Sequence, residues 1–202
     1  MKKQMPESPV IYIAYVDFDG KEDEAVLKSF SPFAVLLCNI ALVAGWHVVV
    51  FILCVRLPRD VFDSQRKRYQ PKHWEKGGRW YKDHLKIQLW KDKVPQFVAK
   101  DGFSKSHITD LSLEYLDEFI METCRGEWMH LANCLCAVVL IVINAFPLGL
   151  IFGVLVVLGN LPFAIIQRYN RFRLDTVRRK KIRDLQHAAT ISQGQEPSRV
   201  SS

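Results

Sequence analysis

The sequence is short of cysteines and arranges none of them for a metal or a disulfide framework. Five cysteines occur among the 202 residues, and no set of them has the spacing of a zinc site. Four lie within apolar stretches, where a thiol usually acts as a small packing side chain: Cys38, Cys54, Cys134 and Cys136. The cysteine pattern therefore gives no indication of an oxidising compartment.

The signatures of several enzyme classes are also missing. The chain contains no Gly-x-Ser-x-Gly nucleophile elbow, no P-loop and no dinucleotide-binding fingerprint. No histidine is followed by an aspartate five positions later, which is the pattern of the common glycerolipid acyltransferases. Cys124 is a candidate nucleophile only because it carries a thiol. Nothing in the sequence marks that thiol as activated.

Charged residues are absent from two long segments, and this absence indicates a membrane protein. Residues 33–55 contain no formally charged side chain at neutral pH, and residues 131–166 are almost purely apolar. The first segment is long enough to cross a bilayer at about 1.5 Å per residue. The second is too long for one crossing and is interrupted by Phe146-Pro147-Leu148-Gly149, so we expect a hairpin of two spans.

The expected fold is therefore an all-α integral membrane protein with about three transmembrane helices. Its expected parts are an acidic N-terminal segment at 1–32, a transmembrane helix at 33–55, a cytoplasmic or interfacial helical segment at 56–130, a transmembrane hairpin at 131–166 and a basic tail at 167–202. We expect the tail to be disordered from Gln186 onward, where Ser, Gln and Ala predominate.

Positive charge is concentrated beside the apolar segments. The formal net charge is +7, and basic runs occur at Arg66-Lys67-Arg68 and Arg178-Arg179-Lys180-Lys181. Beside membrane spans such runs indicate cytoplasmic flanks in contact with anionic lipid, so we expect no nucleic-acid partner. The tail from Gln167 carries nine basic and three acidic residues. We therefore expect a multi-pass membrane protein with the central segment and tail in the cytoplasm and the N-terminus outside.

A group of charged residues stands at the boundary of the second apolar segment. Glu127 and His130 lie on one line of an expected helix, because they are three residues apart. A carboxylate at that spacing can hold one imidazole nitrogen and leave the other free as a general base toward a hydroxyl. Arg125 or Arg168 can bind a phosphate or stabilise an oxyanion. The alternative use of these residues is a salt-bridge cluster that anchors the ends of the spans.

Two of the histidines have other possible uses. His47 follows Trp46 inside the first apolar segment, where a histidine is either functional or a neutral ring hydrogen-bonded to a neighbouring helix. The Glu-x-x-His spacing of Glu127 and His130 also occurs in di-iron helical bundles, but such a site needs a second pair, which this chain lacks. We therefore expect neither a metal nor an organic cofactor.

Several of these blocks together resemble a known family. They comprise Glu122, Thr123, Arg125, Glu127 and His130, then Asn160 and Pro162, then Gln167, Arg168, Tyr169, Asn170, Arg171, Arg173 and Leu174. On these positions the chain resembles the glycosyl-4,4'-diaponeurosporenoate acyltransferases, small bacterial membrane proteins of carotenoid pigment synthesis. The resemblance covers roughly residues 45–185, and it is weaker upstream, at His107, Trp90-Lys91 and Glu75-Lys76.

The resemblance implies transfer of a fatty acyl group from an acyl donor to a hydroxyl of a glycosylated carotenoid or another membrane lipid. Matching positions carry over His130, Glu127 and His107 as site residues, and their chemistry makes them the catalytic candidates. The substrate-binding candidates are Glu122, Arg125, Asn160, Gln167, Arg168, Asn170 and Arg171. Residue chemistry makes His130 the base, oriented by Glu127, with His107 as the competing base. The alternative is a non-catalytic membrane protein that binds lipid or scaffolds other enzymes.

Overall fold

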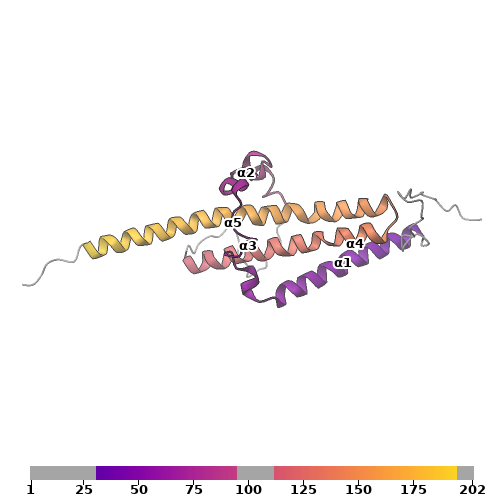
Figure 1. The fold of residues 1–202 in the computed structure, drawn as a ribbon, viewed down its shortest axis with the longest axis horizontal. Helices are drawn as coiled ribbons and strands as arrows, with labels where there is room; N and C mark the ends of the chain where they lie inside the picture. Colours follow the sequence, from indigo (N-terminus) through magenta and orange to yellow (C-terminus); the bar gives the residue numbers. More distant parts are fainter. Residues whose placement is uncertain (1–30, 95–111, 195–202) are drawn as a thin grey trace, which may run out of the picture.

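The described part of the chain consists of helices and turns. The computed structural model describes residues 31–94 and 112–194, which contain no β-strand. Three helical segments are long and apolar enough to cross a membrane: Pro32–Arg56, Leu113–Ile143 and Leu148–Ile191. The expected all-α membrane fold with three spans is therefore confirmed (Figure 1). The candidate base His107 and most of the N-terminal segment lie outside the described residues.

Helix α1, Pro32–Arg56, has the start and stop that its sequence predicts. The Ser31 hydroxyl accepts a hydrogen bond from the backbone N–H of Ala34 at 3.3 Å, and Pro32 occupies the first helical position, where an N–H would have no helical partner. The helix ends just before Pro58, which disfavours a helical conformation in the residue before it. Phe33 and Val55 are exposed, as expected of side chains that face lipid.

The second span is longer than the apolar segment alone suggested. Helix α3, Leu113–Cys134, and helix α4, Cys136–Ile143, follow each other with only Leu135 between them. Together they form a segment of 31 residues from Leu113 to Ile143. We had expected a surface helix that gave way to a short span near Leu131. The surface helix instead continues into the span, and the Ser112 hydroxyl caps its start by accepting the N–H of Tyr115 at 3.2 Å.

Helix α5, Leu148–Gly194, is a single element of 47 residues. It returns alongside α4 and α3 after the interruption at 144–147 and then continues beyond α3 (Figure 1). The expected disorder from Gln186 is therefore wrong up to Gly194. Ala188 and Ala189 have the highest helix propensity, and extending an existing helix costs far less than nucleating a new one.

The central segment folds as a set of short turns that lie against α5. It contains the 3₁₀ helices η1 (Arg59–Phe62), η2 (His73–Gly78) and η3 (Ile87–Leu89) and the short helix α2 (Arg79–Asp83). Tyr81 and Ile87 pack in one buried cluster with Ile166, Tyr169 and Phe172 of α5. This contact places the central segment and the part of α5 beyond Ile166 on the same side of the membrane.

One glycine makes the close approach of this segment to α5 geometrically allowed. Gly78 has a φ of +90°, which L side chains rarely adopt, and a Cβ there would lie 3.1 Å from Cβ of Phe172. A larger residue at position 78 would therefore both strain the backbone and push η2 away from α5.

Candidate active site

Arg168 of α5 uses its whole guanidinium within the protein. Its Nε donates to Oε1 of Glu75 at 2.8 Å and its Nη2 to Oε2 of Glu75 at 2.8 Å. Nη1 donates to the carbonyls of Arg68 and Tyr69 at 3.0 and 3.1 Å, and Nη2 also reaches the carbonyl of Gln70 at 2.7 Å. These five bonds equal the five N–H donors of an arginine. Arg168 therefore has no donor left for a phosphate or an oxyanion, contrary to the role expected of it.

Glu75, the partner of Arg168, is fully buried and was not among the predicted site residues. Burial alone would raise the pKa of its carboxyl group, but hydrogen bonds from Arg168, from the Tyr81 hydroxyl at 2.6 Å and from the backbone N–H of Lys72 outweigh burial and lower that pKa. Glu75 is therefore a charged partner that joins the central segment to α5. Its place in the weak Glu75-Lys76 resemblance was the only signal in the sequence.

Glu127 forms ion pairs with arginines and does not hold His130. Its Oε2 accepts from Nη2 of Arg171, and its Oε1 lies 3.6 Å from Nη1 of Arg168. Arg171 is itself buried, with Nη1 3.4 Å from Sγ of Cys124. The predicted orientation of His130 by Glu127 is therefore wrong. Two cations from the adjacent helix attract the carboxylate more strongly than a neutral imidazole on its own helix can.

His130 instead contacts Asn160, across the interface between α3 and α5. Its Nδ1 lies 3.3 Å from Oδ1 of Asn160, and its ring stacks on that of Phe163 with centroids 5.1 Å apart. The amide Nδ2 of Asn160 lies 3.4 Å from Nε2 of His47 and donates to the carbonyl of Val156 at 3.0 Å. His130, Asn160 and His47 thus form a chain of three polar side chains from three different spans.

The acceptors in this chain determine which ring nitrogens carry protons. Nδ1 of His47 lies 2.8 Å from the carbonyl of Val43, which can only accept, so Nδ1 is the donor. In the neutral ring Nε2 of His47 then accepts from the Asn160 amide. The amide oxygen of Asn160 accepts from Nδ1 of His130, which leaves Nε2 of His130 with a free lone pair. Asn160 therefore does for His130 what was expected of Glu127.

A cavity of about 520 Å³ opens beside this chain within the membrane-spanning region. Its polar lining residues are Asn39, His47 and Asn160, and apolar side chains of α1, α4 and α5 make up most of the remainder, including Ile40, Leu140 and Phe152. Such a volume matches that of ligand pockets in general, which are mostly apolar with a few placed polar groups.

The other predicted binding residues are distributed around these features. Arg125 donates to Glu122 at 2.6 Å and lies over the ring of Phe62 at 5.1 Å, while its Nε is buried without a partner among the described residues. Gln167 lies against Gly126 of α3, where α3 and α5 approach closely. Asn170 is buried and lines a separate cavity. The structure thus brings Asn160 to His130 and gives Arg168 and Arg171 internal partners.

Comparison with known proteins agrees with the sequence blocks that carry these residues. A sequence profile of the family described as glycosyl-4,4'-diaponeurosporenoate acyltransferase matches residues 65–180. This chain belongs to that family. The protein is therefore a membrane acyltransferase, and the reading as a non-catalytic scaffold is set aside.

Individual members of the glycosyl-4,4'-diaponeurosporenoate acyltransferase family are distant relatives. The protein of that name from Staphylococcus aureus (strain MRSA252) is 25% identical over 129 residues, which cover 60% of this chain and 74% of the relative. The one from Staphylococcus haemolyticus (strain JCSC1435) is 27% identical over 125 residues, which cover 61% and 72%. No solved structure matches the chain significantly. The profile match includes Glu75, His130, Asn160 and Arg168 but begins after His47.

Proposed function

We propose that this family member transfers a fatty acyl group to a hydroxyl of a glycosylated carotenoid or a related glycolipid at the cytoplasmic membrane. The S. aureus and S. haemolyticus relatives carry glycosyl-4,4'-diaponeurosporenoate in their names. The observation that carries the proposal is the chain from His130 through Asn160 to His47, beside an apolar cavity in the spans. This chain of side chains links the free Nε2 of His130 to a cavity whose apolar lining suits a lipid chain.

In the proposed reaction Nε2 of His130 is the general base. It takes the proton from the acceptor hydroxyl, whose oxygen attacks the acyl carbonyl carbon of the donor. A new ester C–O bond forms, the bond between the acyl carbon and the donor's leaving group breaks, and His130 returns the proton to that leaving group. Asn160 accepts a hydrogen bond from Nδ1–H of His130 and so holds the ring in one tautomer. The same hydrogen bond stabilises the imidazolium when it forms.

Arg125 is our candidate for the developing oxyanion. Of the two arginines first considered, Arg168 is fully bonded, whereas Arg125 keeps N–H groups beyond its bond to Glu122. Arg125 precedes His130 by five residues on α3. Preorganised donors of this kind stabilise negative charge in the transition state.

The cavity beside Asn160 is proposed to hold the acyl chain or the polyene of the acceptor. Its lining is apolar apart from Asn39, His47 and Asn160, so a long hydrocarbon can lie there with its reacting end at Asn160, the residue that contacts His130. The sugar then approaches from the polar side, where the α3 surface carries Glu122 and Arg125.

Mass spectrometry of lipids and pigments tests this proposal. Host membranes supplied with a glycosylated carotenoid acid are profiled with the wild-type chain, with His130→Ala and with Asn160→Ala. We expect an acylated product with the wild type, no product with His130→Ala, and a roughly 100-fold or greater loss with Asn160→Ala, since general base catalysis contributes about 10²–10⁴. His187→Ala is the matched control, because His187 is exposed near the end of α5. A His130→Ala protein that is inserted and still makes the product at wild-type rate would refute the base assignment.

A further inference from the structure

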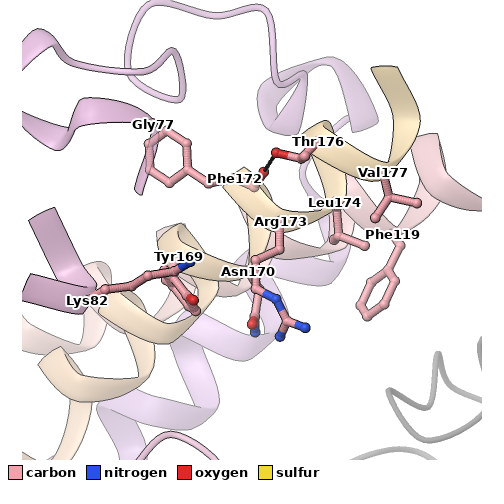
Figure 2. A pocket seen from close by; sticks show the side chains of 10 residues that line it. All are labelled: Gly77, Lys82, Phe119, Tyr169, Asn170, Phe172, Arg173, Leu174, Thr176 and Val177. Carbon is pink, nitrogen blue, oxygen red and sulfur yellow. Dashed lines mark hydrogen bonds between the residues drawn. The ribbon is translucent and has the colours of Figure 1, made fainter. Parts of the chain in front are cut away.

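A second cavity lies between the central segment and α5, just beyond the apolar part of the helix. It has a volume of about 340 Å³. Its lining includes Lys82, Phe119, Asn170, Phe172, Arg173 and Leu174. Figure 2 shows Asn170 and Arg173 extending from α5 in the same direction, with Lys82 reaching in from α2. The reaction proposed above uses none of these residues.

Among the described residues, the lining of this cavity carries positive charge and no negative charge. Lys82 and Arg173 line it, no carboxylate does, and neither cation has an ion pair within the described residues. This contrasts with Arg168 and Arg171 on the same helix, which are buried and paired with Glu75 and Glu127. The two cations at the cavity are therefore available to a ligand.

Asn170 gives an independent indication of a ligand. The residue is only 5% exposed, and its amide Nδ2 has no hydrogen-bond partner in the described part of the chain. A buried amide donor left unpaired costs about 1–3 kcal/mol, so such groups usually have a partner. Since Asn170 lines the cavity between the two cations, a ligand oxygen there would satisfy the donor.

The cavity also has an apolar side and a defined position along the axis of α5. Phe119, Phe172 and Leu174 contribute its apolar lining. Asn170 lies ten residues after Asn160 on α5. The cavity is therefore about 15 Å along the helix axis from the polar chain of His130, Asn160 and His47. A ligand at this place would have its anionic group at the end of the spans and an apolar part that continues toward them.

We propose that this cavity binds the phosphate group of an anionic amphiphile, with Lys82, Arg173 and the amide of Asn170 as its ligands. Cations and N–H donors around a recess at the end of membrane helices are the features that bind phosphorylated headgroups. A phosphate of this kind can come from the carrier portion of an activated acyl donor or from the headgroup of a membrane phospholipid. A phosphate from the acyl donor rests on the proposed function, whereas a phosphate from a membrane phospholipid does not.

Binding measurements on the full chain in nanodiscs test the site and separate the two sources. In phosphatidylcholine nanodiscs, coenzyme A is titrated as the soluble phosphate probe. In nanodiscs that also contain phosphatidylglycerol, retained phosphatidylglycerol is counted by native mass spectrometry. We expect Lys82→Gln and Arg173→Gln each to weaken binding of at least one probe about tenfold, the loss of one charge-assisted hydrogen bond. Weaker binding of coenzyme A alone identifies a site for the acyl donor, and weaker binding of phosphatidylglycerol alone identifies a site for a lipid headgroup. Loss for both identifies a site for the phosphate itself.

Control variants make the result specific to the cavity. Lys93→Gln and Arg183→Gln remove the same charges from exposed positions outside it and should leave both affinities unchanged. Asn170→Leu should weaken binding without lowering the melting temperature, because Nδ2 of Asn170 makes no hydrogen bond within the described residues that the substitution could break. Equal weakening by the control variants would overturn the proposal, as would unchanged binding in both cavity variants.

The outcome is distinguishable from that of the catalytic proposal. His130→Ala should abolish acyl transfer and leave both phosphate affinities unchanged. Arg173→Gln should raise the KM for the donor, or reduce bound lipid, with kcat retained at saturating donor. The catalytic proposal can therefore fail while the phosphate-site proposal holds, and the reverse is also true.

Discussion

Single residues in this protein act through partners on other elements. Arg168 donates all five of its N–H groups to Glu75 and to three backbone carbonyls, and so ties α5 to the central segment. The same ion pair receives a bond from the Tyr81 hydroxyl. Tyr69, whose ring also lies in this region, contributes differently: its hydroxyl is buried without a partner among the described residues.

The two tyrosines form a matched pair for a stability test. Tyr81→Phe removes a 2.6 Å hydrogen bond to the charged Glu75 and should lower the free energy of unfolding by about 1.5–3 kcal/mol. Tyr69→Phe removes a hydroxyl that makes no hydrogen bond, so stability should stay within about 0.5 kcal/mol or rise. Burial raises the pKa of Tyr69 to about 12, so at neutral pH both tyrosines are compared in their neutral form. Denaturation of the detergent-solubilised proteins measures both changes, and an equal loss in the two variants would contradict the assignment.

At the scale of elements, the three spans are joined by amides and by close approach. Asn39 of α1 and Asn144 at the end of α4 exchange two side-chain hydrogen bonds of 2.8 Å, and both residues are buried. In the hairpin a Cβ on Gly149 would lie 2.9 Å from the carbonyl oxygen of Ile141, so only glycine fits there. These contacts hold α1 against the hairpin and thereby bring His47 to Asn160.

A double-mutant cycle tests the amide pair. Asn39→Ala and Asn144→Ala should each lower the stability of the solubilised protein by about 1–2 kcal/mol, and the double variant should lose scarcely more than one single variant, because either change breaks both bonds. Cys38→Ala is the control, since Cys38 is exposed next to Asn39. Additive losses would show that the two amides act independently.

The described part of the molecule is elongated, with its three spans side by side and the central segment against the middle of α5 (Figure 1). The central segment packs on α5 beyond Ile166, so it and the basic tail share one side of the membrane. The two spans of the hairpin, which separate the central segment from the tail, give the same arrangement because two crossings return the chain to the side on which it started. The excess of Lys and Arg in the tail predicts that this is the cytoplasmic side.

Reporter fusions test this orientation. If the tail lies in the cytoplasm as its charge predicts, a green fluorescent protein fused at the C-terminus will fluoresce and alkaline phosphatase fused there will be inactive. Alkaline phosphatase fused at the N-terminus behind an export signal should be active. A cysteine introduced by Ser64→Cys into a cysteine-free variant should resist an impermeant maleimide in intact cells. A labelled residue 64 together with a cytoplasmic C-terminus would contradict the packing of the central segment on α5.

Some features of the fold follow from local sequence alone. Uncharged stretches of sufficient length predict membrane spans in any context, since the bilayer core excludes unpaired charge. The break near Pro147 and the caps at Ser31 and Ser112 likewise depend only on neighbouring residues. Expected disorder after Gln186 was wrong because composition alone does not register a helix that continues from residues already ordered.

The sequence by itself therefore determined the class of the protein, its three spans and its family, whereas the tertiary structure decided which side chains meet. Helical spacing places Glu127 and His130 on one face, but the partners that each selects come from another helix. Asn160 is 30 residues from His130, and Glu75 is 93 residues from Arg168. A charge pairs with the strongest opposite charge within reach, and only the packing of α5 against α3 and the central segment decides what is within reach.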